Sequence, residues 1–277
     1  MNQDKDIFGT RMKEYEVIEA GRKFIPLLPV CARLDGKSFH TYTKKFTRPY
    51  DMRFNRLMID TTKFLVNETN ACMGYSQSDE ISLVYYSDDY NSQIFFDGKI
   101  QKMNSILTSM TTAFFNGQSQ SRLRDPLVPY LPMAYFDCRV WQVPTLTEAA
   151  NVFLWREQDA TKNSISMAAS HYYSHKQLDK KSGKEKQEML FQKGVNWNDY
   201  PNFFKRGTFI QRHDVTRKFT IEEINKLPAK HEARTNPDLQ IKRNEIRELD
   251  MPKFSSVSNR VSVIFEGQEP IPYPSPT

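Results

Sequence analysis

Two stretches decide the fold: VCARLDG at residues 30–36 and MGYSQSDEISLVYY at residues 73–86. The first predicts a short strand that ends at Asp35 and Gly36. The second predicts two strands joined by a polar turn at residues 76–79, because the residues after the turn are mostly strand formers. Each stretch therefore places acidic residues at the end of a strand or in the adjoining turn.

Helices are predicted around these strands. Apolar residues recur near helical spacing within residues 51–69 and again at about 94–115, and a further strand is expected at 135–143. The order strand, helix, strand–strand, helix, strand is the split β-α-β, ferredoxin-like pattern, an antiparallel sheet with both helices on one face. We therefore expect an α+β protein in which residues 1–145 form one domain.

The rest of the chain, residues 146–277, differs in character. Thr145 and Glu148 match the S/T-x-x-E capping box and predict a helix that extends to Tyr173. A lysine-rich linker at residues 175–186 and a short helix follow. We expect this portion to be mixed and mainly helical, with a loosely held, proline-punctuated tail.

Composition and charge exclude several classes of protein. The chain has 39 Lys and Arg against 33 Asp and Glu, a net charge of +6 that favours a polyanionic partner. From Arg156 to Arg247 there are 19 Lys and Arg against 12 Asp and Glu, a net charge of +7, so the excess lies in the second half. The three cysteines are far apart, which argues against a disulfide framework or zinc ribbon and for a reducing, cytoplasmic setting. No stretch is long and apolar enough to span a membrane. Neither GxGxxG nor GxxxxGK[ST] occurs, so any bound phosphates must be held by metals and side chains.

The acids could form a metal site. In a split β-α-β sheet the first strand neighbours the hairpin, so Asp35 and Asp79-Glu80 can converge. Carboxylates together with the Gly36 carbonyl suit Mg²⁺, and a pair of such ions supports phosphoryl transfer. The alternative is a set of solvated turn acids, with an Asx-turn at Asp35.

Basic residues surround these acids in the sequence. Lys37 and Arg48 follow the first strand, and Lys99 and Lys102 share one face of the second predicted helix. If that face lies near the hairpin, the two lysines can meet triphosphate oxygens; otherwise they form a solvated basic face. His40 could transfer a proton, stack on a base, or have no special role.

Six motifs in a fixed order match a known family. They are RLDGKSFHTY (33–42), RPYD (48–51), GYSQSDEIS (74–82), FDGKIQKMNSILTSMTTAFF (96–115), FDCRV (136–140) and FKRG (204–207). Over roughly residues 5–210 the chain thereby resembles the tRNA-histidine guanylyltransferase superfamily, the reverse polymerases that extend RNA at its 5′ end. The resemblance implies a palm domain like that of ordinary polymerases, two Mg²⁺ ions, ATP and GTP as substrates, tRNA as partner, and a homotetramer without a membrane association.

Position by position, the resemblance implies roles for individual residues. Asp35 and Asp79 match the metal-binding aspartates, Gly36 the ligand carbonyl, and Glu80 the neighbouring acid that activity requires. The residues that match nucleotide-binding segments or face the triphosphates are Asp35, Gly36, Lys37, Ser38, Phe39, His40, Arg48, Ser78, Asp79, Lys99 and Lys102.

One departure from the family pattern bears on selectivity. Eukaryotic guanylyltransferases carry HINNLYN after WRQAD, a motif needed to add a guanosine to tRNA-histidine, whereas this chain has WREQDATKNSIS at residues 155–166. Thr161 replaces the histidine and Ser164 an asparagine, while Asn163 remains. The pattern resembles the guanylyltransferase-like branch, which repairs 5′-truncated tRNAs by adding nucleotides templated by the opposite strand. Asn163 either contacts RNA or packs within its helix.

The sequence therefore favours a template-dependent 3′–5′ nucleotidyltransferase that activates the 5′ end of tRNA. We expect Asn163, Lys205 and Arg206 to bind RNA, the last two because FFKRG lies in the positively charged half. The alternatives are a non-templated tRNA-histidine guanylyltransferase, a nucleotide cyclase-like enzyme, and a non-catalytic tRNA-binding protein. A cyclase needs no surface for a polyanion, and a binding protein needs neither Asp35 nor Asp79.

Overall fold

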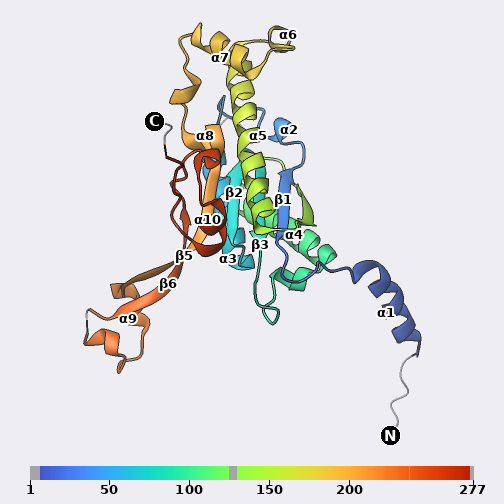
Figure 1. The fold of residues 1–277 in the computed structure, drawn as a ribbon, viewed down its shortest axis with the longest axis vertical. Helices are drawn as coiled ribbons and strands as arrows, with labels where there is room; N and C mark the ends of the chain where they lie inside the picture. The colour runs from blue at the N-terminus through green and yellow to red at the C-terminus, as the bar shows by residue number, and fades with distance from the viewer. Residues whose placement is uncertain (1–6, 125–129, 237, 275–277) are drawn as a thin grey trace.

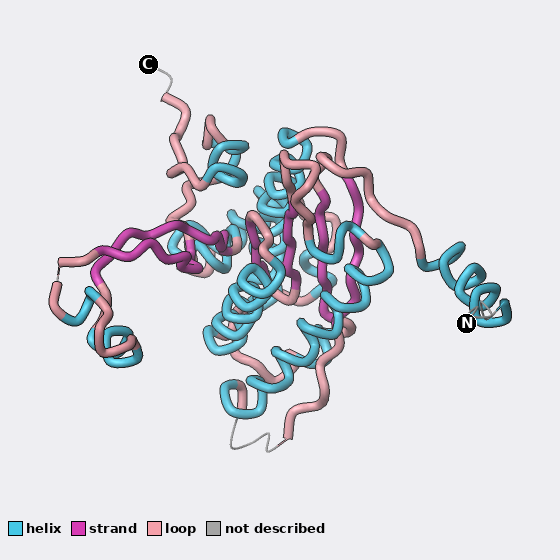
Figure 2. Tube along the Cα trace, turned by 90° about the horizontal axis from the view of Figure 1, so that it is seen from below, coloured by secondary structure: helices cyan, strands magenta, loops and turns pink. Residues whose placement is uncertain are grey.

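The computed structural model describes residues 7–124, 130–236 and 238–274 (Figures 1 and 2). Within these residues, six antiparallel strands form one sheet in the order β4-β1-β3-β2-β5-β6. Their bounds are β1 Val30–Gly36, β2 Met73–Gln77, β3 Glu80–Tyr85, β4 Phe136–Gln142, β5 Thr208–Lys218 and β6 Gln240–Glu248. The first four strands have the predicted ferredoxin-like arrangement, with β1 directly beside β3.

Helices α3 (Met52–Thr69) and α4 (Ile100–Arg122) cover one face of the sheet, as predicted. Asp51 caps α3, because its carboxylate accepts hydrogen bonds from the backbone N–H groups of Arg53 and Phe54. The start of α4 differs from the prediction of residue 94. Phe96 and Asp97 have φ of 50° and 54°, which is incompatible with an α-helix, so the helix begins only after this turn.

Helix α5 (Leu146–Tyr172) and helix α10 (Arg260–Glu266) cover the opposite face. Thr145 caps α5 as the capping-box pattern predicts, accepting a hydrogen bond from the Glu148 N–H at 3.1 Å. Cys31, Val84 and Phe153 lie together in the core between α5 and the sheet. The sheet is thus sandwiched between two helical layers, and α5 crosses it in front of β1–β3 in Figure 1.

The second half of the chain contributes to the same sheet. Strand β5 pairs with β2 from Gly74↔Ile210 to Ser76↔Thr208, and β6 pairs with β5 as far as Lys218↔Gln240. The outer part of this β5–β6 ribbon leaves the body of the molecule and carries α9 (Ile221–Lys226) near its tip (Figures 1 and 2). Helix α1 (Ile7–Ala20) also projects from the body and buries no residue.

The lysine-rich linker is partly helical, contrary to the prediction. It contains α6 (His175–Leu178) and the start of α7 (Gly183–Phe191), which lie near the far end of α5. Ser182 and Glu185 form a capping box at the start of α7, and the Lys, Glu, Gln, Met and Leu residues that follow are good helix formers. Helices α2 (Phe39–Tyr42) and α8 (Asn202–Arg206) complete the region near the sheet. Among the described residues, no helix has the length and apolar character needed to cross a bilayer.

Candidate active site

Asp35 and Asp79 meet at one end of the sheet. Strand β1 ends beside the β2–β3 turn, where the Gly36 N–H donates to the Asp79 carbonyl oxygen at 3.2 Å. Glu80, the first residue of β3, is the direct cross-strand partner of Asp35. Ser78 adopts φ of 53°, a left-handed conformation that reverses the chain between the two strands. The sheet topology therefore brings together the three acids that the sequence singles out.

The two aspartates differ from Glu80 in their electrostatic surroundings. Burial raises the pKa of Asp79, and the negative charge of Asp35 raises it further. None of the ion pairs among the described residues involves either aspartate. Burial also raises the pKa of Glu80, but the Arg156 guanidinium opposes that shift. Asp35 and Asp79 thus form a pair of negative groups that join no ion pair among the described residues, and His40 and Ser78 only partly oppose the raised pKa of Asp79.

Gly36 must be a glycine because the backbone passes close to an aromatic ring. A Cβ atom at this position would lie 2.3 Å from Phe39 Cδ2 and 2.7 Å from Phe39 Cε2. Phe39 is buried and packs against Phe54 and Phe136, with ring centroids 5.9 and 5.0 Å away. Phe39 therefore supports the strand end from the core, and its ring forms part of the floor of the adjacent cavity.

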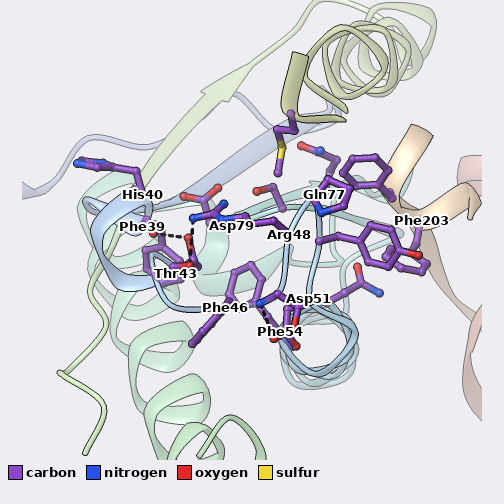
Figure 3. Close-up of a pocket in the computed structure, with 18 of the residues that line it drawn as sticks. Phe39, His40, Thr43, Phe46, Arg48, Asp51, Phe54, Gln77, Asp79 and Phe203 are labelled. Atoms are coloured by element: carbon purple, nitrogen blue, oxygen red, sulfur yellow. Dashed lines mark hydrogen bonds between the residues drawn. The ribbon is translucent and has the colours of Figure 1, made fainter. Parts of the chain in front are cut away.

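A cavity of about 460 Å³ opens beside the aspartates (Figure 3). Aromatic residues line much of it, and Figure 3 shows Phe46, Phe54 and Phe203 around it, with His40 at its outer edge. Arg48 also lines the cavity, and its Nη2 donates to the Thr43 carbonyl at 3.1 Å. This aromatic cavity combines apolar walls, carboxylates and one arginine, which suits a ligand that is flat at one end and anionic at the other.

A second cavity, of about 740 Å³, meets the first at the aspartates. One wall of this second cavity is a polar face of α5, which carries Asp159, Asn163, Ser166 and Ser170 at helical spacing. We call it the α5 groove. The residues that line both cavities are Asp35, Arg48, Pro49, Gln77, Ser78, Asp79 and Met167.

The segment after Asp35 divides between the cavity, the core and the surface. Ser38 and His40 line the aromatic cavity, whereas Phe39 also packs into the core. Lys37 is exposed and lines neither cavity, and its backbone N–H donates to the Tyr135 carbonyl at 2.8 Å.

Lys99 and Lys102 lie at the opposite end of the sheet from the aspartates. Helix α4 starts after β3 ends, Ile100 N–H donates to the Arg22 carbonyl, and Lys99 forms a bridge with Lys23. Neither lysine lines a cavity that contains Asp35. Of the two alternatives left open by the sequence, this helix face therefore does not lie near the hairpin within one chain, because a helix that returns antiparallel to its strand begins at that strand's far end.

Lys205 is not on the surface, which corrects the expectation for the FFKRG segment. Its side chain is buried over the Trp197 ring, and its Nζ donates to the Asn198 carbonyl at 2.5 Å. Arg206 is half-buried, and its positive charge lowers the pKa of the buried Glu157, which burial itself raises. Lys205 thus stabilises α8 against its neighbours and is not available to an RNA phosphate.

The stretch that departs from HINNLYN divides into buried and exposed positions. Ser164 is fully buried, where its Oγ accepts a hydrogen bond from Trp197 Nε1 at 3.2 Å. Asn163 is exposed and lines the α5 groove, while Thr161 lines neither cavity. Of these three positions, only Asn163 faces the site.

Arg156 is the main site residue that sequence reasoning does not find. Its Nε and Nη2 donate to the two carboxylate oxygens of Glu80 at 2.6 and 2.8 Å. The one signal in the sequence is that Arg156 lies within an amphipathic helix that also buries apolar side chains. That signal does not say with which acid the arginine pairs. Aromatic residues of α8, such as Phe203, are also absent from the sequence predictions, because α8 reaches the cavity only through tertiary packing.

The residues at the strand end fit a hard divalent cation. Asp35 and Asp79 are oxygen donors that take part in none of the ion pairs among the described residues, and the Gly36 carbonyl lies at the same strand end. A bound cation would relieve the repulsion that raises the pKa of Asp79. Two carboxylates and a carbonyl suit Mg²⁺, which prefers oxygen ligands, keeps waters and binds substrate phosphates.

Comparison with known proteins identifies the family. A family model described as tRNAHis guanylyltransferase matches residues 9–144. A solved structure of a bacterial tRNA(His) guanylyltransferase-like protein in complex with ATP is 40% identical in sequence, with a TM-score of 0.69 over 74% of this chain and 88% of that one. The chain belongs to the tRNA(His) guanylyltransferase family. It is therefore a nucleotidyltransferase, and its sheet has the polymerase-like fold of this family.

Two further relatives extend this likeness. A bacterial tRNA(His) guanylyltransferase-like protein in complex with GTP is 33% identical, with a TM-score of 0.68 over 90% of this chain and 94% of that one. The tRNA(His) guanylyltransferase of Saccharomyces cerevisiae is 29% identical over 217 residues, which cover 72% of this chain and 88% of the yeast protein. The resemblance seen in the sequence motifs is thus confirmed over most of the chain.

Proposed function

We propose that this protein adds nucleotides to the 5′ end of tRNA, with the opposite strand as template, and so repairs 5′-truncated tRNAs. The observation that carries the proposal is that two cavities meet at Asp35 and Asp79. A transfer between two nucleotide substrates needs both reacting ends at one pair of carboxylates, and a two-cavity site provides that arrangement.

The aromatic cavity is the proposed nucleoside triphosphate site. Its volume and aromatic walls suit a nucleobase, and Arg48 lies where the two cavities join, within reach of triphosphate oxygens. The bacterial relatives in complex with ATP and with GTP support ATP and GTP as the substrates here. The polar α5 groove then receives the 5′ end of the RNA, with Asn163 on its wall.

The proposed reaction has two steps. A phosphate oxygen of the RNA 5′-monophosphate attacks the α-phosphate of ATP or GTP and releases pyrophosphate. The 3′-hydroxyl of the incoming nucleotide then attacks the activated 5′ phosphate and releases the nucleoside monophosphate. Asp35, Asp79 and the Gly36 carbonyl would hold two Mg²⁺ ions, which polarise the phosphates and favour deprotonation of the hydroxyl. The protein itself contributes mainly the positioning of the reacting groups and a preorganised set of charges around them.

Templating is proposed from the residues that replace HINNLYN. Ser164 is buried against Trp197, so a larger amide could not occupy that space without displacing the indole. Of this stretch, Asn163, Ser166 and Met167 line the groove, so Asn163 is the one amide among them that could hold a particular RNA end without base pairing. A non-templated tRNA(His) guanylyltransferase is the second candidate, favoured by the name of the yeast relative. The family resemblance further favours a homotetramer that works in the cytoplasm.

The test is transfer of labelled nucleotide to RNA. The protein is incubated with 5′-monophosphorylated, 5′-truncated tRNA, Mg²⁺ and each labelled nucleoside triphosphate, and the RNA 5′ end is mapped. We expect Mg²⁺-dependent extension that disappears in Asp35→Asn and persists in the matched control Asp88→Asn, because Asp88 is exposed in the loop after β3 and lines neither cavity. Cyclic nucleotide formed from triphosphate alone would show a cyclase. RNA binding without any transfer would show a binding protein.

A further inference from the structure

The carboxylate of Glu80 is fully engaged by a single arginine. Arg156 Nε donates to Glu80 Oε1 at 2.6 Å and Arg156 Nη2 to Oε2 at 2.8 Å, a bidentate pair. The side chains are only 8% and 13% exposed. Arg156 Nη2 also lies 3.2 Å from Asp159, and the guanidinium stacks on Trp155 with a centroid distance of 4.5 Å. These contacts hold the guanidinium in place at the edge of the α5 groove, which both Glu80 and Arg156 line.

The position of Glu80 in the sheet explains why it needs such a partner. Side chains alternate along a strand, so Asp35 lies on the same face of β1 as Cys31, which packs toward α5. Glu80 lies on the corresponding face of β3, directly opposite Asp35. Two like charges directly opposite each other destabilise a strand pair. Arg156, with Arg33 Nε 3.8 Å from Glu80 Oε2, compensates this repulsion.

Building on the proposed function, we propose that Glu80 acts through Arg156 as a positioning pair. The pair joins α5 to the first residue of β3, one residue after Asp79, and so fixes the β2–β3 turn relative to Asp35. Glu80 then neither holds a metal ion nor touches the reacting atoms, although it belongs to the acidic triplet at the strand ends. The aspartates, which take part in no ion pair in the part of the chain that the structure describes, are then the metal-binding pair.

A direct metal titration separates the two roles without relying on transfer activity. Mn²⁺ binding to the full chain is measured by the loss of the free-ion electron paramagnetic resonance signal. We expect Glu80→Gln to bind Mn²⁺ within about twofold of the wild-type affinity, and Asp79→Asn to lose most of that affinity. A Glu80→Gln affinity lowered tenfold or more would overturn the proposal and make Glu80 a ligand.

A double-mutant cycle on the transfer rate tests the coupling to Arg156. Glu80→Gln and Arg156→Gln should each slow single-turnover transfer by about 10–100-fold, and the double variant should be no slower than the worse single one. Arg156→Lys should remain slow, because lysine keeps the charge but not the bidentate geometry. Effects that multiply in the double variant would refute the pairing.

Two controls keep these results interpretable. Arg139→Gln removes an exposed arginine that pairs with Asp137, the cross-strand neighbour of Asp35 on β4, and should leave the transfer rate unchanged. If Arg156→Gln does not fold, Arg156→Lys and the Glu80→Gln metal titration decide the question. If wild-type protein binds Mn²⁺ as expected but never extends RNA, the proposed function fails, and the metal titration still decides the role of Glu80.

Discussion

Adding one methyl group at Gly36 tests how the core positions the strand end. In Gly36→Ala the new Cβ would lie 2.3–2.7 Å from atoms of the Phe39 ring. The ring cannot move away, because Phe54, Phe115 and Phe136 surround it with centroids 5.0–5.9 Å distant. Overpacking of this kind lowers the free energy of unfolding by about 1–3 kcal/mol.

The partner substitution predicts a rescue. Phe39→Ala alone leaves a cavity and should destabilise the protein by about 3–5 kcal/mol. When Gly36→Ala and Phe39→Ala are combined, the added methyl group occupies the space that the ring has left, so its own cost of about 1–3 kcal/mol disappears. The double variant should therefore be about as stable as Phe39→Ala alone.

The assay is urea denaturation monitored by circular dichroism. The midpoint and the slope of the unfolding free energy against urea concentration are compared between variants. Gly36→Ala should shift the midpoint without changing that slope, and it should also slow nucleotide transfer, because it displaces the proposed ligand carbonyl. A Gly36→Ala protein within about 0.5 kcal/mol of wild type, or effects that simply add in the double variant, would refute the reasoning.

Three further predictions concern charge. Asp79→Asn should reduce the rate of nucleotide transfer about 10³-fold or more, measured by a quenched transfer assay. It should not lower stability in metal-free buffer, measured by thermal unfolding, because burial and the charge of Asp35 both disfavour the charge that the substitution removes. Lys205→Met should lower the free energy of unfolding by about 1 kcal/mol and leave the salt dependence of RNA binding unchanged. If Arg206 contacts an RNA phosphate, Arg206→Gln should reduce the slope of log binding constant against log salt concentration by about 0.9. Filter binding from low to high salt measures both effects on RNA binding. Burial lowers the pKa of His213 below its usual value of 6.5, so the unfolded chain binds a proton at this histidine more readily than the folded protein does. The folded state therefore loses stability relative to the unfolded chain as the pH falls below about 6.5. Urea denaturation at pH 7.5 and 5.5 should show a smaller loss of stability for His213→Gln than for wild type.

The sequence was sufficient for the part of the fold that positions the site. Strand alternation and helix periodicity predict the β1, β2–β3 and β4 framework, and the neighbouring positions of β1 and the hairpin bring Asp35 to Asp79. Capping chemistry at Thr145 also places the start of α5 correctly, because a cap depends on residues only three apart.

Tertiary placement of single charges could not be predicted in the same way. Lys99 and Lys102 share a helix face, yet helical spacing does not say at which end of the sheet that face lies. Lys205 has the composition of a surface residue but is covered by Trp197, and Arg156 pairs with Glu80 from 76 positions away. Such contacts depend on how the helical layers pack, and no local pattern records them.

The most direct test of the proposed function is the identity of the added nucleotide. Single-turnover extension is measured on 5′-truncated acceptor stems in which the unpaired 3′-side base is each of the four bases in turn, with all four nucleoside triphosphates present. The templated account predicts that the nucleotide complementary to that base is added in every case, across tRNA identities, and that addition stops when the stem is complete. Addition of guanosine opposite every base, or only to tRNA with the histidine anticodon, would contradict it.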